Sequence, residues 1–153
     1  MHNSRSPFFT VAYFVGILLF PILASGSVTG VIKLTDSDGT EQLNFASGST
    51  LYIRVTDSDR NTDSGTAETI TVTIKSETES SGETVTLTET GVATGIFQGS
   101  IAFEEASASS GDSKLQVSRG DKLTATYVDP ADDFGNEATI TDVAFYSVSL
   151  KSG

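Results

Sequence analysis

The chain has no cysteine and no tryptophan, and its only histidine is His2. Without cysteine it forms no disulfide and offers no thiolate as nucleophile or metal ligand. Without a histidine beyond the first residues it has no imidazole base, which excludes Ser-His-Asp and Cys-His catalysis. A metal bound by such a chain must be held by oxygen atoms.

Positive charge is also scarce. The 153 residues include 9 Lys and Arg against 20 Asp and Glu, which gives a net charge of −11. Nucleic-acid binding depends on basic patches that neutralise phosphates, so we expect no nucleic-acid partner. The length suits one domain with a proper hydrophobic core.

The N-terminus has the order of a secretion signal. Arg5 precedes an apolar run over residues 8–23, and small residues follow around Gly26. We therefore predict that residues 1–26 are a secretory signal peptide and that residues 27–153 are a single secreted, extracellular domain. The alternative is a retained membrane anchor, but the run is shorter than the roughly 20 residues of a typical span. The mature chain then has no membrane span.

Beyond the signal, apolar residues alternate with Thr and other polar residues at a period of two, which is typical of half-buried strands. The main segments are residues 28–35, 51–56, 69–75, 84–88, 97–103, 123–127 and 137–150, and the two short ones are 43–45 and 115–117. Turns recur every 8–12 residues or so, as in sandwiches. We predict an all-β fold, an immunoglobulin-like antiparallel β-sandwich of about seven main strands.

Two details of this pattern predict local structure. The apolar phase changes near Asp142 and Val143, which indicates a bulge or bend in the last strand. The alternation places four aromatic side chains in the core: Phe97, Phe103, Tyr127 and Phe145.

The strongest chemical signal follows residues 51–56. Oxygen-bearing side chains occupy alternate positions at Asp57, Asp59, Asn61 and Asp63, and Glu68 is the twelfth residue counted from Asp57. Calcium prefers six to eight oxygen ligands, so this stretch predicts a Ca²⁺ site. It is not a helix-flanked EF-hand, because its sixth residue is Thr62 and its flanks are strands. The alternative is an Asx-rich turn that binds nothing.

An internal repeat enlarges the candidate site. The spacing of Leu43, Phe45, Gly48, Leu51 and Asp57 recurs in Leu115, Val117, Gly120, Leu123 and Asp129. In a sandwich the loops after the second and sixth main strands lie at the same end, together with the turn after Glu89. The predicted calcium ligands are Asp57, Asp59, Asn61, Asp63, Glu68, Glu89, Asp129, Asp132 and Asp133. The alternative is that the loops splay and their acids stay solvated.

Three stretches, residues 45–63, 83–100 and 120–130, carry a resemblance. The most specific is Leu-Thr-Glu-Thr-Gly…Thr-Gly-Ile-Phe-x-Gly within residues 87–99. It resembles the repeat unit of large secreted archaeal and bacterial surface proteins of the S-layer, adhesin or matrix type. The resemblance implies an immunoglobulin-like fold and a structural or adhesive role. Such units usually occur in tandem, so this single unit is either a subunit that polymerises or part of a longer chain.

Both ends of the predicted domain are apolar and prone to form strands, at residues 27–34 and 143–150. Either could add to an exposed sheet edge of a neighbour. The alternative is that the last strand simply completes its own sheet. We expect a secreted, calcium-stabilised structural or adhesive module of a cell-surface layer or extracellular filament. Its partners would be copies of itself, joined by terminal strand addition, or other cell-surface proteins.

The sequence leaves two alternative functions. A binding module for glycan or protein could use the acidic end loops, where Phe134 is the one aromatic residue. A glycoside hydrolase could pair Glu89 with Asp129 or Asp133. Sugar clefts are lined by aromatic side chains, and the chain has no Trp. We therefore expect no enzymatic activity.

Overall fold

The computed structural model describes residues 26–147, which form nine strands and no α-helix. The predicted signal peptide, residues 1–26, lies outside the described residues apart from Gly26, and residues 148–153 also lie outside them. Within the described range, no helix is long and apolar enough to span a membrane.

Seven longer strands and two short ones make up the fold, as the alternation predicts. The longer strands are β1 (Val31–Thr35), β3 (Thr50–Thr56), β4 (Thr69–Lys75), β5 (Glu83–Glu89), β6 (Ile96–Glu104), β8 (Lys122–Asp129) and β9 (Ala138–Ser147). The short ones are β2 (Asn44–Ala46) and β7 (Lys114–Gln116). One 3-10 turn, η1 (Ser58–Arg60), follows β3.

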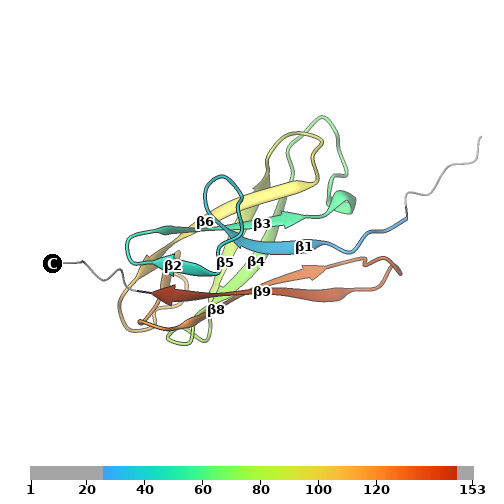
Figure 1. Ribbon diagram of the computed structural model, residues 1–153. Coiled ribbons are helices and arrows are strands. Elements are labelled where there is room, and N and C mark those ends of the chain that lie inside the picture. The colour runs from blue at the N-terminus through green and yellow to red at the C-terminus, as the bar shows by residue number, and fades with distance from the viewer. Residues whose placement is uncertain (1–25, 148–153) are drawn as a thin grey trace, which may run out of the picture.

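The strands form one curled sheet in the order β1-β3-β6-β5-β4-β8-β9-β2, with β7 on β6. Only two residue pairs join β5 to β6, so the sheet folds there into two layers (Figure 1). The layers also meet where the Leu34 N–H donates to Asp142 Oδ2 at 2.7 Å. This all-β, sandwich-like fold confirms the predicted class. The prediction of a wholly antiparallel arrangement needs correction, because β2 pairs with β9 and β7 with β6 in parallel.

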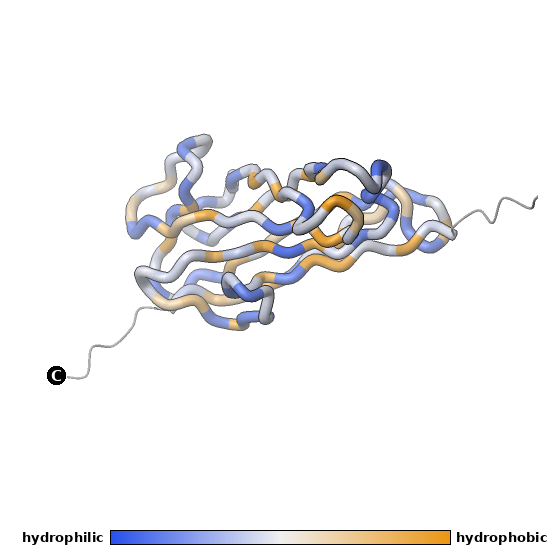
Figure 2. Tube along the Cα trace, turned by 90° about the horizontal axis from the view of Figure 1, so that it is seen from above, coloured by the Kyte–Doolittle hydropathy of each residue, from blue (hydrophilic) through white to orange (hydrophobic). Residues whose placement is uncertain are grey.

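The core lies between the two layers and is built from one side of each strand. Apolar and polar residues alternate along the strands, whereas the loops at both ends are largely hydrophilic (Figure 2). Fully burying a Leu, Ile, Val or Phe side chain stabilises a fold by about 1.5–3 kcal/mol. The residues with no exposed surface include Leu34, Leu51, Ile53, Val55, Ile74, Leu87, Phe97, Leu115 and Leu123.

The predicted bulge in the last strand is wrong. β9 pairs with β8 without interruption, from Ala138 opposite Asp129 to Phe145 opposite Lys122. The apparent change of phase has another cause. Asp142 points toward β1 and accepts the Leu34 N–H there, so an acid occupies a partly buried position in a regular strand.

The same regular phase decides which aromatic residues are buried. Phe97 and Tyr127 are in the core and Phe103 packs against it, as predicted. Phe145 is 48 % exposed, so its assignment to the core is wrong. Tyr146, on the opposite side of β9, is buried instead.

The direction of the strands gives the molecule two distinct ends. β3, β5 and β8 run the same way, so the loops after them, residues 57–68, 89–95 and 129–137, lie together at what we call the acidic end. The shared position of these loops is thus confirmed. Loops 76–82 and 105–113 lie at the opposite, or far, end. The described chain begins at the acidic end and finishes at the far end (Figure 1).

Candidate functional site

Two buried aspartates begin the loops of the acidic end. Asp57 is 1 % exposed and Asp129 is fully buried. The Asp57 Oδ1 atom accepts the Asp59 N–H at 3.0 Å, and the Asp129 Oδ1 atom accepts the Ala131 N–H at 2.9 Å. Each aspartate therefore closes an Asx turn in the loop that follows it, which is what Asp does well at such positions.

The second oxygen of each aspartate ties its loop to another part of the sandwich. Asp57 Oδ2 accepts the Tyr127 hydroxyl at 2.6 Å, and Asp129 Oδ2 accepts the Gly30 N–H at 2.7 Å. Burial raises the pKa of Asp57, the Tyr127 hydrogen bond opposes that shift, and nearby Asp129 adds to it. Burial and Asp57 both raise the pKa of Tyr127, which stays protonated. Asp57 and Asp129 thus have a structural role of their own.

Two further predicted ligands hold the segment that precedes β1. Asp59 Oδ2 accepts the Val28 N–H at 2.7 Å and the Ser27 hydroxyl at 2.9 Å. Asp133 Oδ1 accepts the Thr29 N–H at 2.9 Å. The segment entering β1 is therefore fastened across the acidic end by side chains from two different loops.

Asp63 and Asp132 act within their own turns. Asp63 Oδ1 accepts the Gly65 N–H at 2.9 Å. Asp132 Oδ1 accepts the N–H groups of Phe134 and Asn136, both at 2.9 Å. These are the local bonds expected of an Asx-rich turn, and they account for both side chains without a metal.

The remaining three predicted ligands differ from the other six. The Oδ1 atom of Asn61 and the Oε2 atoms of Glu68 and Glu89 are buried and find no hydrogen-bond donor among residues 26–147. A buried polar atom without a partner costs roughly 1–3 kcal/mol, and more when it is charged. These three atoms therefore need an explanation.

The other carboxylate oxygens of Glu68 and Glu89 are held firmly in place. Glu68 Oε1 accepts the N–H groups of Thr62 at 2.7 Å and Asp63 at 2.6 Å. These N–H groups directly follow Asn61 in the chain, which places the Glu68 carboxylate against the Asn61 segment. One carboxylate thus ties the end of loop 57–68 to its middle.

Glu89 is anchored by the turn that follows β5. Its Oε1 atom accepts the N–H groups of Thr94 and Gly95, both at 2.7 Å. Its own N–H donates to the Glu68 carbonyl at 2.9 Å, and the two carboxyl groups lie within hydrogen-bond reach of each other. Glu68 and Glu89 therefore form a pair of neighbouring carboxylates.

The charge of this pair is not balanced by a basic side chain. Burial alone would raise the pKa of Glu89, but the N–H groups of Gly95 and Thr94, together with the hydrogen bonds to Glu68, outweigh it and hold the pKa below its usual value. Glu89 is therefore ionised at neutral pH. In the described part of the chain, the ion pairs join Lys33 to Glu41 and Lys114 to Glu104, away from Glu89.

We call Asn61, Glu68 and Glu89 the Glu89 site. No three Asp, Glu, His or Cys side chains of residues 26–147 already stand together as metal ligands. The Glu89 site has two carboxylates and takes its third oxygen from an amide. A hard cation such as Ca²⁺ accepts such a mixture and completes its shell with backbone carbonyls and water.

A second group of buried acids, at the far end, is absent from the predicted ligands. Glu79 is fully buried and Glu83 is 4 % exposed. The alternation of Glu83, Val85, Leu87 and Glu89 is a signal that could have revealed one of them, because it places both glutamates on the inward side of β5. No comparable signal marks Glu79, which lies in a polar loop.

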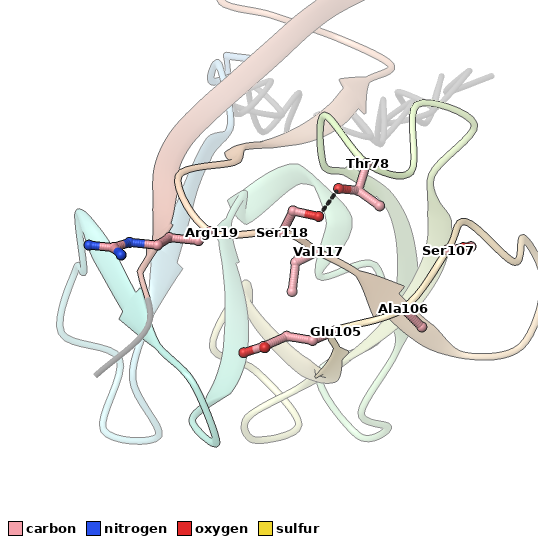
Figure 3. A pocket seen from close by; sticks show the side chains of 7 residues that line it. All are labelled: Thr78, Glu105, Ala106, Ser107, Val117, Ser118 and Arg119. Atoms are coloured by element: carbon pink, nitrogen blue, oxygen red, sulfur yellow. Dashed lines mark hydrogen bonds between the residues drawn. The ribbon is translucent and has the colours of Figure 1, made fainter. Parts of the chain in front are cut away.

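An open pocket of about 440 Å³ also lies at the far end (Figure 3). The Thr78 hydroxyl donates to the Ser118 hydroxyl at 2.9 Å on one side of it, while Arg119 extends away from Thr78. None of the side chains that line it is aromatic, so it offers no ring for a sugar to stack on.

Comparison with known proteins finds no family model that matches the chain and no matching curated protein.

Proposed function

We propose that this protein is a secreted, calcium-stabilised structural or adhesive module of a cell-surface layer or extracellular filament. One observation carries the calcium part of the proposal. Three oxygens of the Glu89 site, on Asn61, Glu68 and Glu89, are buried without a hydrogen-bond donor in the described residues. A bound cation would satisfy all three and neutralise the carboxylate pair.

Calcium is the cation that suits this chemistry best. The candidate ligands are a mixture of carboxylate and amide oxygens from loop 57–68 and the end of β5. Ca²⁺ accepts six to eight such ligands in irregular geometry, whereas Mg²⁺ demands a near-ideal octahedron. Two of the three side chains come from a loop, and a tolerant ion fits a loop more readily.

The arrangement of the ends supports a role as a building block. The described chain begins at the acidic end and finishes at the far end, so copies placed end to end would extend in one direction (Figure 1). A linear array is what a filament or surface layer requires. The resemblance to repeat units of secreted surface proteins points the same way.

Terminal strand addition is the proposed mode of self-association. β1 pairs with β3 along one edge. On its other edge, Thr35 bridges Glu41, and the Leu34 carbonyl and N–H are bonded to Gln42 and Asp142. A strand from a neighbouring copy would pair with the part of this edge that these bonds leave open, and main-chain bonds would supply the affinity.

No enzymatic activity is part of the proposal. A carboxylate pair for glycoside hydrolysis would need Asp129 or Asp133 beside Glu89. Asp129 is fully buried with both oxygens bonded, and Asp133 is bonded to the Thr29 N–H. Neither is placed as a free acid or base facing a substrate cleft.

Thermal unfolding of residues 27–153 in millimolar CaCl₂ and in EDTA tests the proposal, with size-exclusion chromatography run alongside. We expect calcium to raise the midpoint, because a ligand that binds only the folded state stabilises it. A larger particle in calcium would show that the ion also joins subunits. Identical midpoints in calcium and EDTA would overturn the calcium site.

The second candidate function is a binding module for glycan or protein at the acidic end. The observation in its favour is Phe134, which is 87 % exposed on loop 129–137. A pocket of about 240 Å³, lined in part by Arg60, Tyr127 and Pro130, lies at the same end. If the protein is such a binding module, Phe134→Ala would abolish binding of the labelled protein to cell surfaces. If it is instead an assembling module, Phe134→Ala would leave its particle size unchanged.

A further inference from the structure

The far end of the sandwich holds a second set of buried acids that the Glu89 site does not use. Glu79, in the loop between β4 and β5, is fully buried, and Glu83, the first residue of β5, is nearly so. The carboxyl groups of Glu79 and Glu83 lie within hydrogen-bond reach of each other, and Asp112 is close enough to repel Glu79. Three acids from two loops and a strand therefore lie near one another here, although they do not already stand together as metal ligands.

The hydrogen bonds around this cluster leave one oxygen unsatisfied. Glu79 Oε2 accepts the Gln116 N–H at 3.0 Å. Its Oε1 atom is buried and accepts no hydrogen bond within residues 26–147. Because Glu79 is fully buried, water is a poor substitute for a partner, and an unpaired buried carboxylate oxygen is costly.

The neighbouring donors are already engaged in fixing the other acids. Gln116 is fully buried, and its Nε2 group donates to Asp112 Oδ2 at 3.0 Å and to Glu104 Oε2 at 3.2 Å. The Lys114 ammonium is bonded to Glu104 at 2.8 Å and is half-exposed. Neither Gln116 nor Lys114 therefore bonds the free oxygen of Glu79.

The acids also hold loop 105–113 in place. Every residue of this loop is exposed, so no apolar burial secures it. Instead, Glu83 accepts the N–H groups of Gly111 and Ser113. The position of the loop thus depends on the charge of a carboxylate that itself faces Glu79.

We propose that Glu79, Glu83 and Asp112 bind a second Ca²⁺ ion, which fastens loop 105–113 across the far end of the sandwich. The ligands are oxygens, Glu79 Oε1 is buried without a donor, and the three carboxylates would bind the ion by turning toward a common point while Glu83 and Asp112 keep their present hydrogen bonds. This site is independent of the Glu89 site. The two lie at opposite ends of β5, about 20 Å apart at the usual rise of a strand.

Calorimetric titration of residues 27–153 with CaCl₂, paired with hydrogen exchange at Gly111 and Ser113, tests the inference. We expect Glu79→Gln to bind one calcium fewer than the wild type. We expect calcium to slow exchange of both amides in the wild type and in Glu89→Gln, but not in Glu79→Gln. Glu77→Gln is the matched control, because Glu77 is an exposed acid of the same loop, and it should behave as the wild type.

Several outcomes would overturn the second site. One is an unchanged calcium count in Glu79→Gln. Another is wild-type exchange at Gly111 and Ser113 that is the same in calcium and in EDTA, which is the result expected if Glu79 and Glu83 share a proton and bind no ion. The exchange measurement on the wild type remains decisive should Glu79→Gln not fold. If the Glu89 site binds no calcium and the second site does, the wild type would bind one calcium and Glu79→Gln none.

Discussion

Asp57 and Asp129 make the same local hydrogen bond in two different loops. Each Oδ1 atom accepts the N–H group two residues further along the chain, at 3.0 Å and 2.9 Å. Asp57 directly follows β3 and Asp129 ends β8, and each of these strands comes after a short strand that pairs in parallel with the opposite layer. The internal repeat in the sequence is therefore a structural repeat, and its acids close turns as well as adding charge.

The bond from Tyr127 to Asp57 predicts the effect of Tyr127→Phe. This change keeps the ring but removes the donor that meets Asp57 Oδ2 at 2.6 Å. Hydrogen bonds to charged groups contribute about 1.5–3 kcal/mol, so we expect a loss of that size in the free energy of unfolding. Urea unfolding at pH 7 measures it. Tyr52→Phe is the control, since the Tyr52 hydroxyl makes no hydrogen bond within residues 26–147, and its effect should stay within about 0.5 kcal/mol.

A close approach of two backbones predicts a cost for Gly95→Ala. Gly95 has a φ of +60°, and an added Cβ would lie 2.9 Å from the Ser58 Cα atom and 3.0 Å from the Asp57 carbonyl. The change would push the turn after β5 away from η1 and disturb the N–H that Glu89 accepts. We expect a loss above about 2 kcal/mol, beyond the roughly 1 kcal/mol of a strained backbone alone.

Gly48→Ala is the control that separates the cost of backbone strain at a positive φ from the cost of a steric clash with η1. Gly48 has a φ of +81°, but an added Cβ would meet nothing within 4 Å. It should therefore show only the cost of the positive φ. Equal losses of stability in the two variants would contradict the proposed contact between the turn and η1.

The pKa of Glu105 predicts a dependence on pH. The hydroxyl groups of Tyr146 and Ser47 donate to this carboxylate at 2.6 Å and 2.9 Å, and they hold its pKa below the usual value. A lowered pKa in the folded state gives stability above the unfolded pKa of about 4.3, which is lost as pH falls through the folded pKa. Glu105→Gln should thus be less stable than the wild type at pH 7 and equal to it near pH 2.5.

Urea unfolding at several pH values checks this prediction. Glu137→Gln, at an exposed position that makes no side-chain hydrogen bond in the described residues, should differ little from the wild type at any pH. A difference between Glu105→Gln and the wild type that is constant with pH would mean that the Tyr146 and Ser47 bonds do not depend on the charge of Glu105.

The opposite positions of two phenylalanines predict unequal costs of truncation. Phe97 is fully buried, whereas Phe145 is 48 % exposed on β9. Phe97→Ala should cost about 3–5 kcal/mol, as expected for removal of a core phenylalanine. Phe145→Ala should cost far less, under about 1.5 kcal/mol. Thermal unfolding of both variants tests the ranking, and a similar loss in both would contradict the regular phase of β9.

Much of this fold was predictable because the alternation of residues is regular. The period of two located the strands, and the order of antiparallel pairs placed loops 57–68, 89–95 and 129–137 at one end. The sequence was a weaker guide to which side of β9 faces the core. Whether Phe145 or Tyr146 faces inward depends on the seam with β1, where Asp142 meets the Leu34 N–H, and no local pattern records that contact.

The candidate ligands show a similar limit. Composition and spacing identified the acids of loop 57–68, but could not tell Asp63, which closes its own turn, from Glu68, whose Oε2 atom has no donor in the described residues. That distinction depends on where the folded loop places the N–H groups of Thr62, Asp63 and Gly65. The burial of Glu79 likewise arises from packing between loops that are distant in sequence.

The rise in the unfolding midpoint that calcium causes, which we call the calcium increment, distinguishes binding at the Glu89 site from general electrostatic effects. Calcium at about 100 times its dissociation constant stabilises the folded state by about 2.7 kcal/mol, or about 10 °C for a domain of this size. We expect such an increment in the wild type and a clearly smaller one in Glu89→Gln, which removes a ligand charge. Glu89→Gln also weakens the bonds from Thr94 and Gly95, so each variant is compared with itself in EDTA.

Glu137→Gln supplies the matched control for that measurement. Glu137 is an exposed acid at the same end of the sandwich, so its replacement changes the net charge equally and leaves the Glu89 site intact. It should keep the full calcium increment. If Glu137→Gln and Glu89→Gln lose equal parts of the increment, calcium acts by screening the negative charge of the acidic end, since screening depends on total charge and not on which carboxylate is removed.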